Sequence, residues 1–235
     1  MEWISDPDIW IAFLTLCALE IVLGIDNIIF ISIVTSRLPE AQQSSARRIG
    51  LLLAMVMRIV LLFSLTQIMA LTGTLFTVFD HDISGRDLIL LIGGMFLLYK
   101  SVSEIHSKVA ETEKSKTKKP EARFGPTIAQ IVAIDLIFSF DSVITAVGMV
   151  DRIEVMIAAV IFSVGVMMFA AGPISRFINR HPAVKVLALS FLMMIGLALI
   201  AEGVDFHIPK GFIYFAMAFS IMVELINIRI KVREE

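Results

Sequence analysis

The most restrictive feature of this sequence is a series of seven long apolar stretches separated by polar connections. A helix needs about 20 mainly apolar residues to cross the hydrocarbon of a bilayer, and the stretches run close to that length. They cover residues 10–34, 49–71, 88–104, 127–150, 155–172, 185–201 and 211–228, to within a few residues. The sequence therefore predicts an all-α membrane protein with seven transmembrane helices.

The composition favours the same class of protein. Of the 235 residues, 57% are apolar and only 18% are charged, and the mean hydropathy is +0.87. Soluble domains average about 25% charged residues, so a soluble globule of this size could not cover so much apolar surface. The net charge of −2 gives no overall attraction to nucleic acid, and no nucleic-acid partner is expected.

Cysteine and histidine usage limits the metal chemistry that we expect. The single cysteine, Cys17, excludes an intrachain disulfide and a thiolate cluster for zinc or iron–sulfur. The four histidines all fall in or near polar connections: His81, His106, His181 and His207. A histidine-based metal site within the apolar stretches is therefore not expected.

The distribution of Lys and Arg predicts the orientation. The N-terminal segment contains no base, and the second, fourth and sixth connections contain one each: Arg86, Arg152 and Lys210. The other connections and the C-terminal tail are richer in bases. Since cytoplasmic connections carry the excess of Lys and Arg, the N-terminus is predicted outside and the C-terminus in the cytoplasm. The charged stretch at about 107–124 is the one linker by composition, a solvated connector that could also attract anionic lipid.

Two segments on either side of this linker resemble each other. Residues 18–37 align with residues 133–152 at a constant offset of 115. Four polar pairs match at this offset: Glu20 with Asp135, Asp26 with Asp141, Asn27 with Ser142, and Arg37 with Arg152. The two copies lie in the first and fourth predicted spans, so they cross the bilayer in opposite directions.

This pattern predicts one membrane domain over residues 1–235 with two inverted-topology three-helix repeats. The repeats cover about 9–106 and 125–206, and a last helix follows at about 211–228. Secondary transporters use such repeats, with the binding site at the repeat interface near the middle of the membrane.

The four carboxylates near the middle of the first and fourth apolar stretches, Glu20, Asp26, Asp135 and Asp141, need a partner other than lipid. Each costs about 2.5–3.5 kcal/mol at the centre of a spanning helix. One interpretation is a structural network with Arg58, which lies midway along the second stretch and is a candidate charge partner. One arginine cannot neutralise four carboxylates, however, so we favour a bound divalent cation.

The available ligands are hard oxygens: the four carboxylates, the Asn27 amide, and the Ser139 and Ser142 hydroxyls. Oxygen-only coordination suits Mg2+, Ca2+ or Mn2+. On an ideal helix Glu20 and Asp26 lie about 120° apart and about 9 Å along the axis. They could share an ion if the helix were distorted at Gly24, or each ion could take one acid from each half.

Three stretches carry a resemblance to a known family: EIVLGIDNIIFI at 20–31, DLIFSFDSVITAVGM at 135–149 and AEGVDFHIPKGFIYFAMAFSIMVE at 201–224. The sequence resembles short bacterial members of the TerC family of integral membrane proteins. The resemblance implies a multi-pass protein of the bacterial inner (cytoplasmic) membrane that handles metal ions, with manganese export the best-supported activity and calcium raised for some relatives. The positions that carry over are Glu20, Asp26, Asn27, Asp135, Asp141 and Ser142.

The sequence thus predicts a secondary transporter that exports a divalent metal ion from the cytoplasm, with Mn2+ as the favoured substrate and protons as the coupling ion. A Ca2+ transporter of the same mechanism is one alternative. Another is a non-transporting membrane factor that assists the assembly or metallation of other proteins. No nucleotide-binding G-x-x-x-x-G-K-[ST] is present. No enzymatic activity is expected, since no Gly-x-Gly-Asp surrounds any of the acids as an intramembrane aspartyl protease would require.

Overall fold

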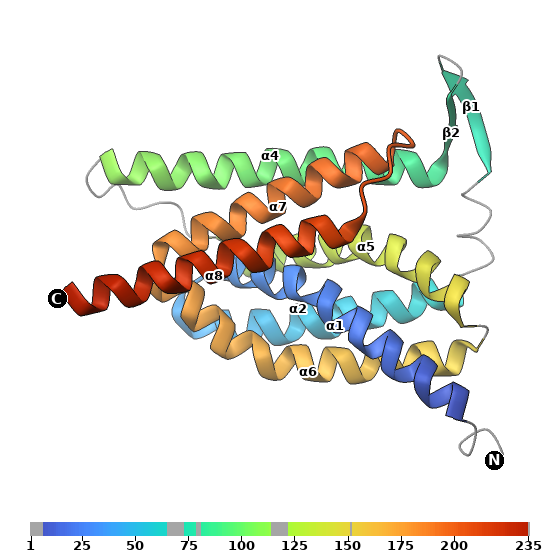
Figure 1. The fold of residues 1–235 in the computed structure, drawn as a ribbon, viewed down its shortest axis with the longest axis horizontal. Coiled ribbons are helices and arrows are strands. Elements are labelled where there is room, and N and C mark those ends of the chain that lie inside the picture. The colour runs from blue at the N-terminus through green and yellow to red at the C-terminus, as the bar shows by residue number, and fades with distance from the viewer. Residues whose placement is uncertain (1–6, 65–72, 79–80, 114–121, 151, 235) are drawn as a thin grey trace. The chain divides into compact units, whose positions relative to one another are not determined.

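A computed structural model of the chain describes residues 7–64, 73–78, 81–113, 122–150 and 152–234. At some positions within these ranges only the backbone is described, and Asp26 and Asp141 are two of them. Seven helices account for most of the described residues (Figure 1): α1 (Pro7–Thr35), α2 (Glu40–Phe63), α4 (Gly85–Glu113), α5 (Phe124–Met149), α6 (Ile153–Arg180), α7 (Pro182–Glu202) and α8 (Lys210–Glu234).

The prediction of a helical membrane protein is confirmed. Each predicted apolar stretch coincides with one described helix, and five helices are long and apolar enough to cross a bilayer: α1, α4, α6, α7 and α8. Helix α2 ends at Phe63, and residues 65–72, which include most of the rest of the predicted 49–71 stretch, lie outside the described residues. In α5 the apolar part described is the shorter segment Phe124–Phe140. The number of spans and the inverted repeat stay predictions.

Several helices extend beyond the apolar stretches. Helix α2 begins at Glu40, well before the predicted start at residue 49, and α4 continues to Glu113, into the segment predicted as a connector. Both extensions consist largely of Ala, Glu, Gln, Lys, Arg and Ser. Most of these residues have high helix propensity, so the helix continues after the apolar pattern ends.

A two-stranded antiparallel hairpin precedes α4, and the sequence analysis did not anticipate it. Strand β1 (Thr74–Val78) pairs with β2 (His81–Ser84), with Thr77 opposite Asp82. The Thr77 hydroxyl donates a hydrogen bond to Asp82 Oδ1 at 2.7 Å. The β-branched and aromatic residues of TLFTV suit a strand, but a five-residue pattern is too short to distinguish from a loop in sequence.

The chain forms two compact units. The first contains α1, α2, α5 and α6 up to Phe177, and the second contains the hairpin, α4, α7 and α8. In the first unit α2 packs against α5, and Leu16, Ile33, Leu62, Ile131 and Ile134 are among its fully buried side chains.

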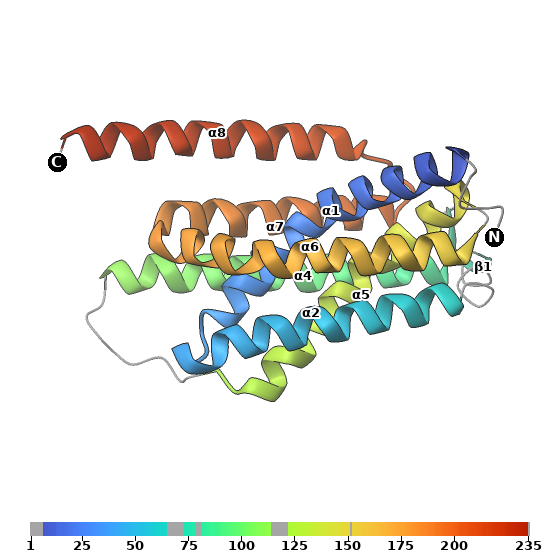
Figure 2. The ribbon, with the colours of Figure 1, turned by 90° about the horizontal axis from the view of Figure 1, so that it is seen from below.

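In the second unit α4 and α7 pack against each other (Figure 1 and Figure 2). The two helices approach closely at Gly94 and Gly196, where a Cβ on Gly94 would lie 2.6 Å from the Gly196 carbonyl oxygen. Only glycine allows the two backbones this close, as in the small-residue contacts of membrane helices. Phe191 of α7 and Ile213 and Met217 of α8 form the apolar contact between the last two helices.

Candidate ion-binding site

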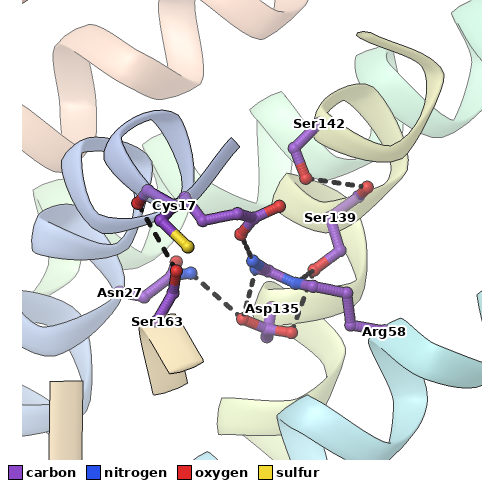
Figure 3. Close-up of polar contacts among 8 residues, drawn as sticks. Cys17, Asn27, Arg58, Asp135, Ser139, Ser142 and Ser163 are labelled. Carbon is purple, nitrogen blue, oxygen red and sulfur yellow. Dashed lines mark hydrogen bonds and ion pairs between the residues drawn. The ribbon is translucent and has the colours of Figure 1, made fainter. Parts of the chain in front are cut away.

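The Arg58 guanidinium of α2 lies between two carboxylates within the first unit (Figure 3). Its Nη1 forms an ion pair with Glu20 Oε2 of α1, and its Nη2 lies 3.2 Å from Asp135 Oδ1 of α5. The three residues are 3%, 6% and 7% exposed, respectively. A single cation buried in the helix bundle therefore joins three helices through two acids.

The geometry of α5 holds Asp135 in place. Ser139 follows Asp135 by one helical turn, so both side chains lie on one face. The Ser139 hydroxyl accepts a hydrogen bond from Arg58 Nε at 2.8 Å and donates one to Asp135 Oδ2 at 3.0 Å. Asn27 Nδ2 donates to Asp135 Oδ1 at 3.0 Å. Both carboxylate oxygens of Asp135 thus accept hydrogen bonds.

One described oxygen of the cluster has no partner. Asn27 Oδ1 is buried and makes no hydrogen bond to any group that the structure describes. An ionised carboxylate only accepts, so the Asn27 amide must turn its NH2 toward Asp135 and its oxygen the other way. Buried polar atoms without a partner are rare, and an amide oxygen is a ligand that hard cations accept.

The charges of the described cluster do not balance. One guanidinium faces two carboxylates, which leaves a formal charge of −1 when both acids are ionised. Burying an uncompensated charge costs several kcal/mol. A proton or a further cation at the acids would balance this charge.

A small cavity adjoins Glu20. Its volume is about 10 Å³, and apolar side chains such as Leu16, Leu62 and Val143 form the rest of its lining. This volume is close to the least that a single water needs. In this conformation the space beside Glu20 is thus too small for a hydrated divalent ion.

The structure brings together three of the six predicted site residues, Glu20, Asn27 and Asp135, with Arg58. Ser142 is buried, but its hydroxyl donates to the Ser139 carbonyl oxygen at 3.1 Å on its own helix. The side chains of Asp26 and Asp141 lie outside the described residues. Within the described residues, no three His, Cys, Asp or Glu side chains are grouped so that they could hold a metal ion.

Two features of the first unit differ from sequence reasoning. Helix α1 runs without interruption through Gly24, where a distortion had been considered. The glycine instead admits Met167 of α6, whose sulfur would lie 2.3 Å from a Cβ at this position. Ser139 is one of the oxygens available in sequence, but the sequence pattern does not place it among the predicted site residues. Its spacing of four from Asp135 is the signal that could have found it.

Ser163 of α6 was missed altogether. Its hydroxyl donates to the Cys17 carbonyl oxygen of α1 at 3.4 Å, one turn before Glu20 (Figure 3). A lone serine in an apolar helix gives no sequence signal of its partner. This contact links α6 to the helix that carries Glu20.

The long apolar helices and the buried acid–arginine cluster define a multi-pass helical membrane protein with a polar centre. The chain belongs to the TerC family of integral membrane proteins, whose family model matches residues 5–235. The resemblance noted in the sequence is thereby confirmed.

Similar proteins share nearly the whole chain. It is 58% identical over 232 residues to the "UPF0053 protein" of Haemophilus influenzae, covering 98% of each chain. It is 56% identical to the "UPF0053 inner membrane protein YgdQ" of Escherichia coli K12, covering 96% of this chain and 95% of that one. The "UPF0053 inner membrane protein YoaE" of the same organism is 51% identical over 97% of this chain, which spans 44% of it. No solved structure matches.

Proposed function

We propose that this protein is a secondary transporter that exports a divalent metal ion, Mn2+ in preference to Ca2+, from the cytoplasm in exchange for protons. The observation that carries the proposal is the excess of one buried carboxylate over guanidinium around Arg58, beside the unpartnered Asn27 oxygen. A transporter needs a site whose negative charge can be neutralised alternately by its substrate and by a coupling ion.

In this mechanism Arg58 holds the acids together while no metal ion is bound. An entering cation replaces Arg58 as the counter-charge of Glu20 and Asp135, and the Asn27 oxygen is a further hard ligand. Asp26, Asp141 and Ser142 complete the ligand set in the proposal. After release to the outside, Arg58 pairs with the acids again, and a proton neutralises the remaining charge. No covalent step is involved, so the protein is not proposed to be an enzyme.

The alternating access that export requires follows from the inverted repeat. Glu20 and Asp135 occupy aligned positions of the two similar segments, and both contact the same guanidinium. A shared partner for aligned residues supports a pseudo-twofold relation between the halves. In the proposed topology the N-terminus faces outside and the C-terminus the cytoplasm of an inner membrane, as the distribution of bases predicts.

Reconstituted flux tests the proposal. Purified protein in liposomes should move Mn2+ in the direction opposite to the protons when a proton gradient is imposed. Ca2+ is measured in parallel. Glu20→Gln should abolish this flux, because one neutral side chain leaves the described cluster without its excess negative charge. Glu224→Gln is the matched control, since Glu224 lies on α8 in the other unit and contacts Asn227. Wild-type protein that moves neither ion would refute the transporter.

The second candidate is a membrane factor that assists the assembly or metallation of other proteins without moving ions itself. The direct pairing of Arg58 with both Glu20 and Asp135 favours it, because such a network also has a purely structural use. Such a factor predicts no flux in liposomes from either wild type or variants. It also predicts that cells lacking the protein have defects in membrane or exported proteins at unchanged cytoplasmic metal content.

A further inference from the structure

A second polar site lies in the first unit, where α2 begins and α6 approaches its end. Three arginines line a cavity of about 290 Å³ there: Arg47 and Arg48 of α2 and Arg176 of α6. Ser44 contributes a hydroxyl to the lining, and Met168 and Phe169 contribute an apolar side. The cavity is far larger than the one beside Glu20 and is separate from the acid cluster.

The positive charge of this cavity is not balanced by the part of the chain that the structure describes. No described carboxylate lies within ion-pair distance of the three guanidinium groups, and Arg47 Nη1 contacts the Ser175 hydroxyl at 3.4 Å. Arg47 precedes the apolar stretch of α2. Its partial burial, together with Arg176 and Arg48, lowers the pKa of its guanidinium. Like charges are thus held close together around an open space.

We propose that this cavity binds a phosphate group, and that the phosphate of an anionic phospholipid headgroup is its ligand. The guanidinium group of arginine binds two phosphate oxygens at once. Three guanidinium groups around one cavity supply more hydrogen-bond donors than one phosphate can accept. A bound anion removes the repulsion among the three guanidinium groups.

The position of the cavity selects a lipid over a soluble phosphate. The arginines of α2 come directly before the apolar stretch that begins at residue 49, and Arg176 follows the stretch that ends at residue 172. Both positions correspond to the predicted cytoplasmic surface of the bilayer, where anionic headgroups lie. Phe169, which is 87% exposed, and Met168 offer an apolar surface for an acyl chain beside the charged one.

The test uses full-length protein in detergent and native mass spectrometry with phosphatidylglycerol or phosphatidylcholine. The double variant Arg47→Gln, Arg176→Gln is compared with the control double variant Arg180→Gln, Arg229→Gln. The control removes the same charge from residues that do not line the cavity. We expect phosphatidylglycerol affinity to fall about fivefold for each cavity arginine and to stay within about twofold in the control.

Each outcome decides the proposal. Equal losses in both double variants would overturn it in favour of general charge attraction, and the absence of a loss in the cavity variant would overturn it outright. If the cavity variant does not fold, Arg48→Gln replaces it, because Arg48 is exposed, and the same fivefold loss is expected. Inorganic phosphate is titrated separately. If it binds alone at millimolar concentration and displaces phosphatidylglycerol, the phosphate site stands but the lipid assignment is overturned.

Discussion

Replacing Arg58 with glutamine removes the only described cation that contacts the buried acids. In the wild type, Glu20 and Asp135 face one guanidinium, so the described cluster has a formal charge of −1. In Arg58→Gln the same two acids carry −2 with no counter-charge among the described residues. Breaking a buried ion pair by removing one partner costs about 3–5 kcal/mol. Because one guanidinium serves two acids here, we expect a loss of free energy of unfolding at the upper end of that range.

Glu20→Gln should cost much less, although it breaks the same pair. The variant keeps Arg58 paired with Asp135, so its formal charge is zero, and the glutamine oxygen can still accept from Nη1. We expect a loss of about 1–2 kcal/mol, the cost of weakening a charge-assisted hydrogen bond. The double variant Arg58→Gln, Glu20→Gln should be more stable than the sum of the two losses predicts, because it carries only one unpaired acid.

Reversible unfolding in mixed detergent–SDS micelles measures these free energies. Arg86→Gln is the control, because Arg86 of α4 also pairs with a carboxylate, Glu202, at 3.1 Å but in a more exposed position. A partly exposed pair contributes about 0–1 kcal/mol. The reasoning is refuted if Arg58→Gln is no more destabilising than Glu20→Gln or than the Arg86 control.

Three further outcomes follow from the geometry. Asn27→Leu removes the donor to Asp135 and the unpartnered oxygen, so the apparent Mn2+ affinity in liposome flux should fall about 10–100-fold; an unchanged affinity would remove Asn27 from the site. Gly94→Ala places a Cβ 2.6 Å from the Gly196 carbonyl and should destabilise by about 1–3 kcal/mol in the same unfolding assay, whereas Gly165→Ala, with no atom within 4 Å, should have little effect. Gly24→Ala should cost less than Gly94→Ala, since Met167 is flexible and can move, and an equal cost would contradict this.

The helical membrane fold could be predicted from the sequence because a bilayer imposes one dominant requirement. Every spanning segment must be long, apolar and hydrogen-bonded within itself, and this leaves a direct mark on composition. The residues at which the helices end are not set by this requirement, so the composition does not predict them. Outside the bilayer, residues such as those of 40–48 and 107–113 can be helix or coil at nearly equal free energy, and the structure has them as helix.

The candidate site was predictable only in part. The sequence gives the position of a residue along its spanning helix, but it does not give the direction in which the side chain points. The mid-span positions of Glu20, Asp135 and Arg58 make Arg58 a candidate charge partner of the acids. The spacing of four residues places Ser139 beside Asp135 on α5, but which of Ser139 and Ser142 accepts from Arg58 depends on the face that α5 turns toward α2. A sequence does not fix how a helix is rotated about its axis, so only the packed structure shows which serine reaches the guanidinium.

The arrangement around Arg58 bears on why a transporter would retain a buried arginine. Four acids in apolar helices would repel one another whenever the metal ion leaves, and the helices that carry them would separate or take up several protons. An arginine that bridges one acid from each similar segment keeps α1 and α5 together in the absence of the ion, through contacts that a cation can replace one for one. The pairing of Arg58 with both acids also leaves one negative charge without a counter-charge among the described groups. The acids are therefore held together, but the cluster still attracts a positive ion. A purely structural ion pair would gain nothing from that excess, and the excess is therefore the feature on which the proposed transport depends.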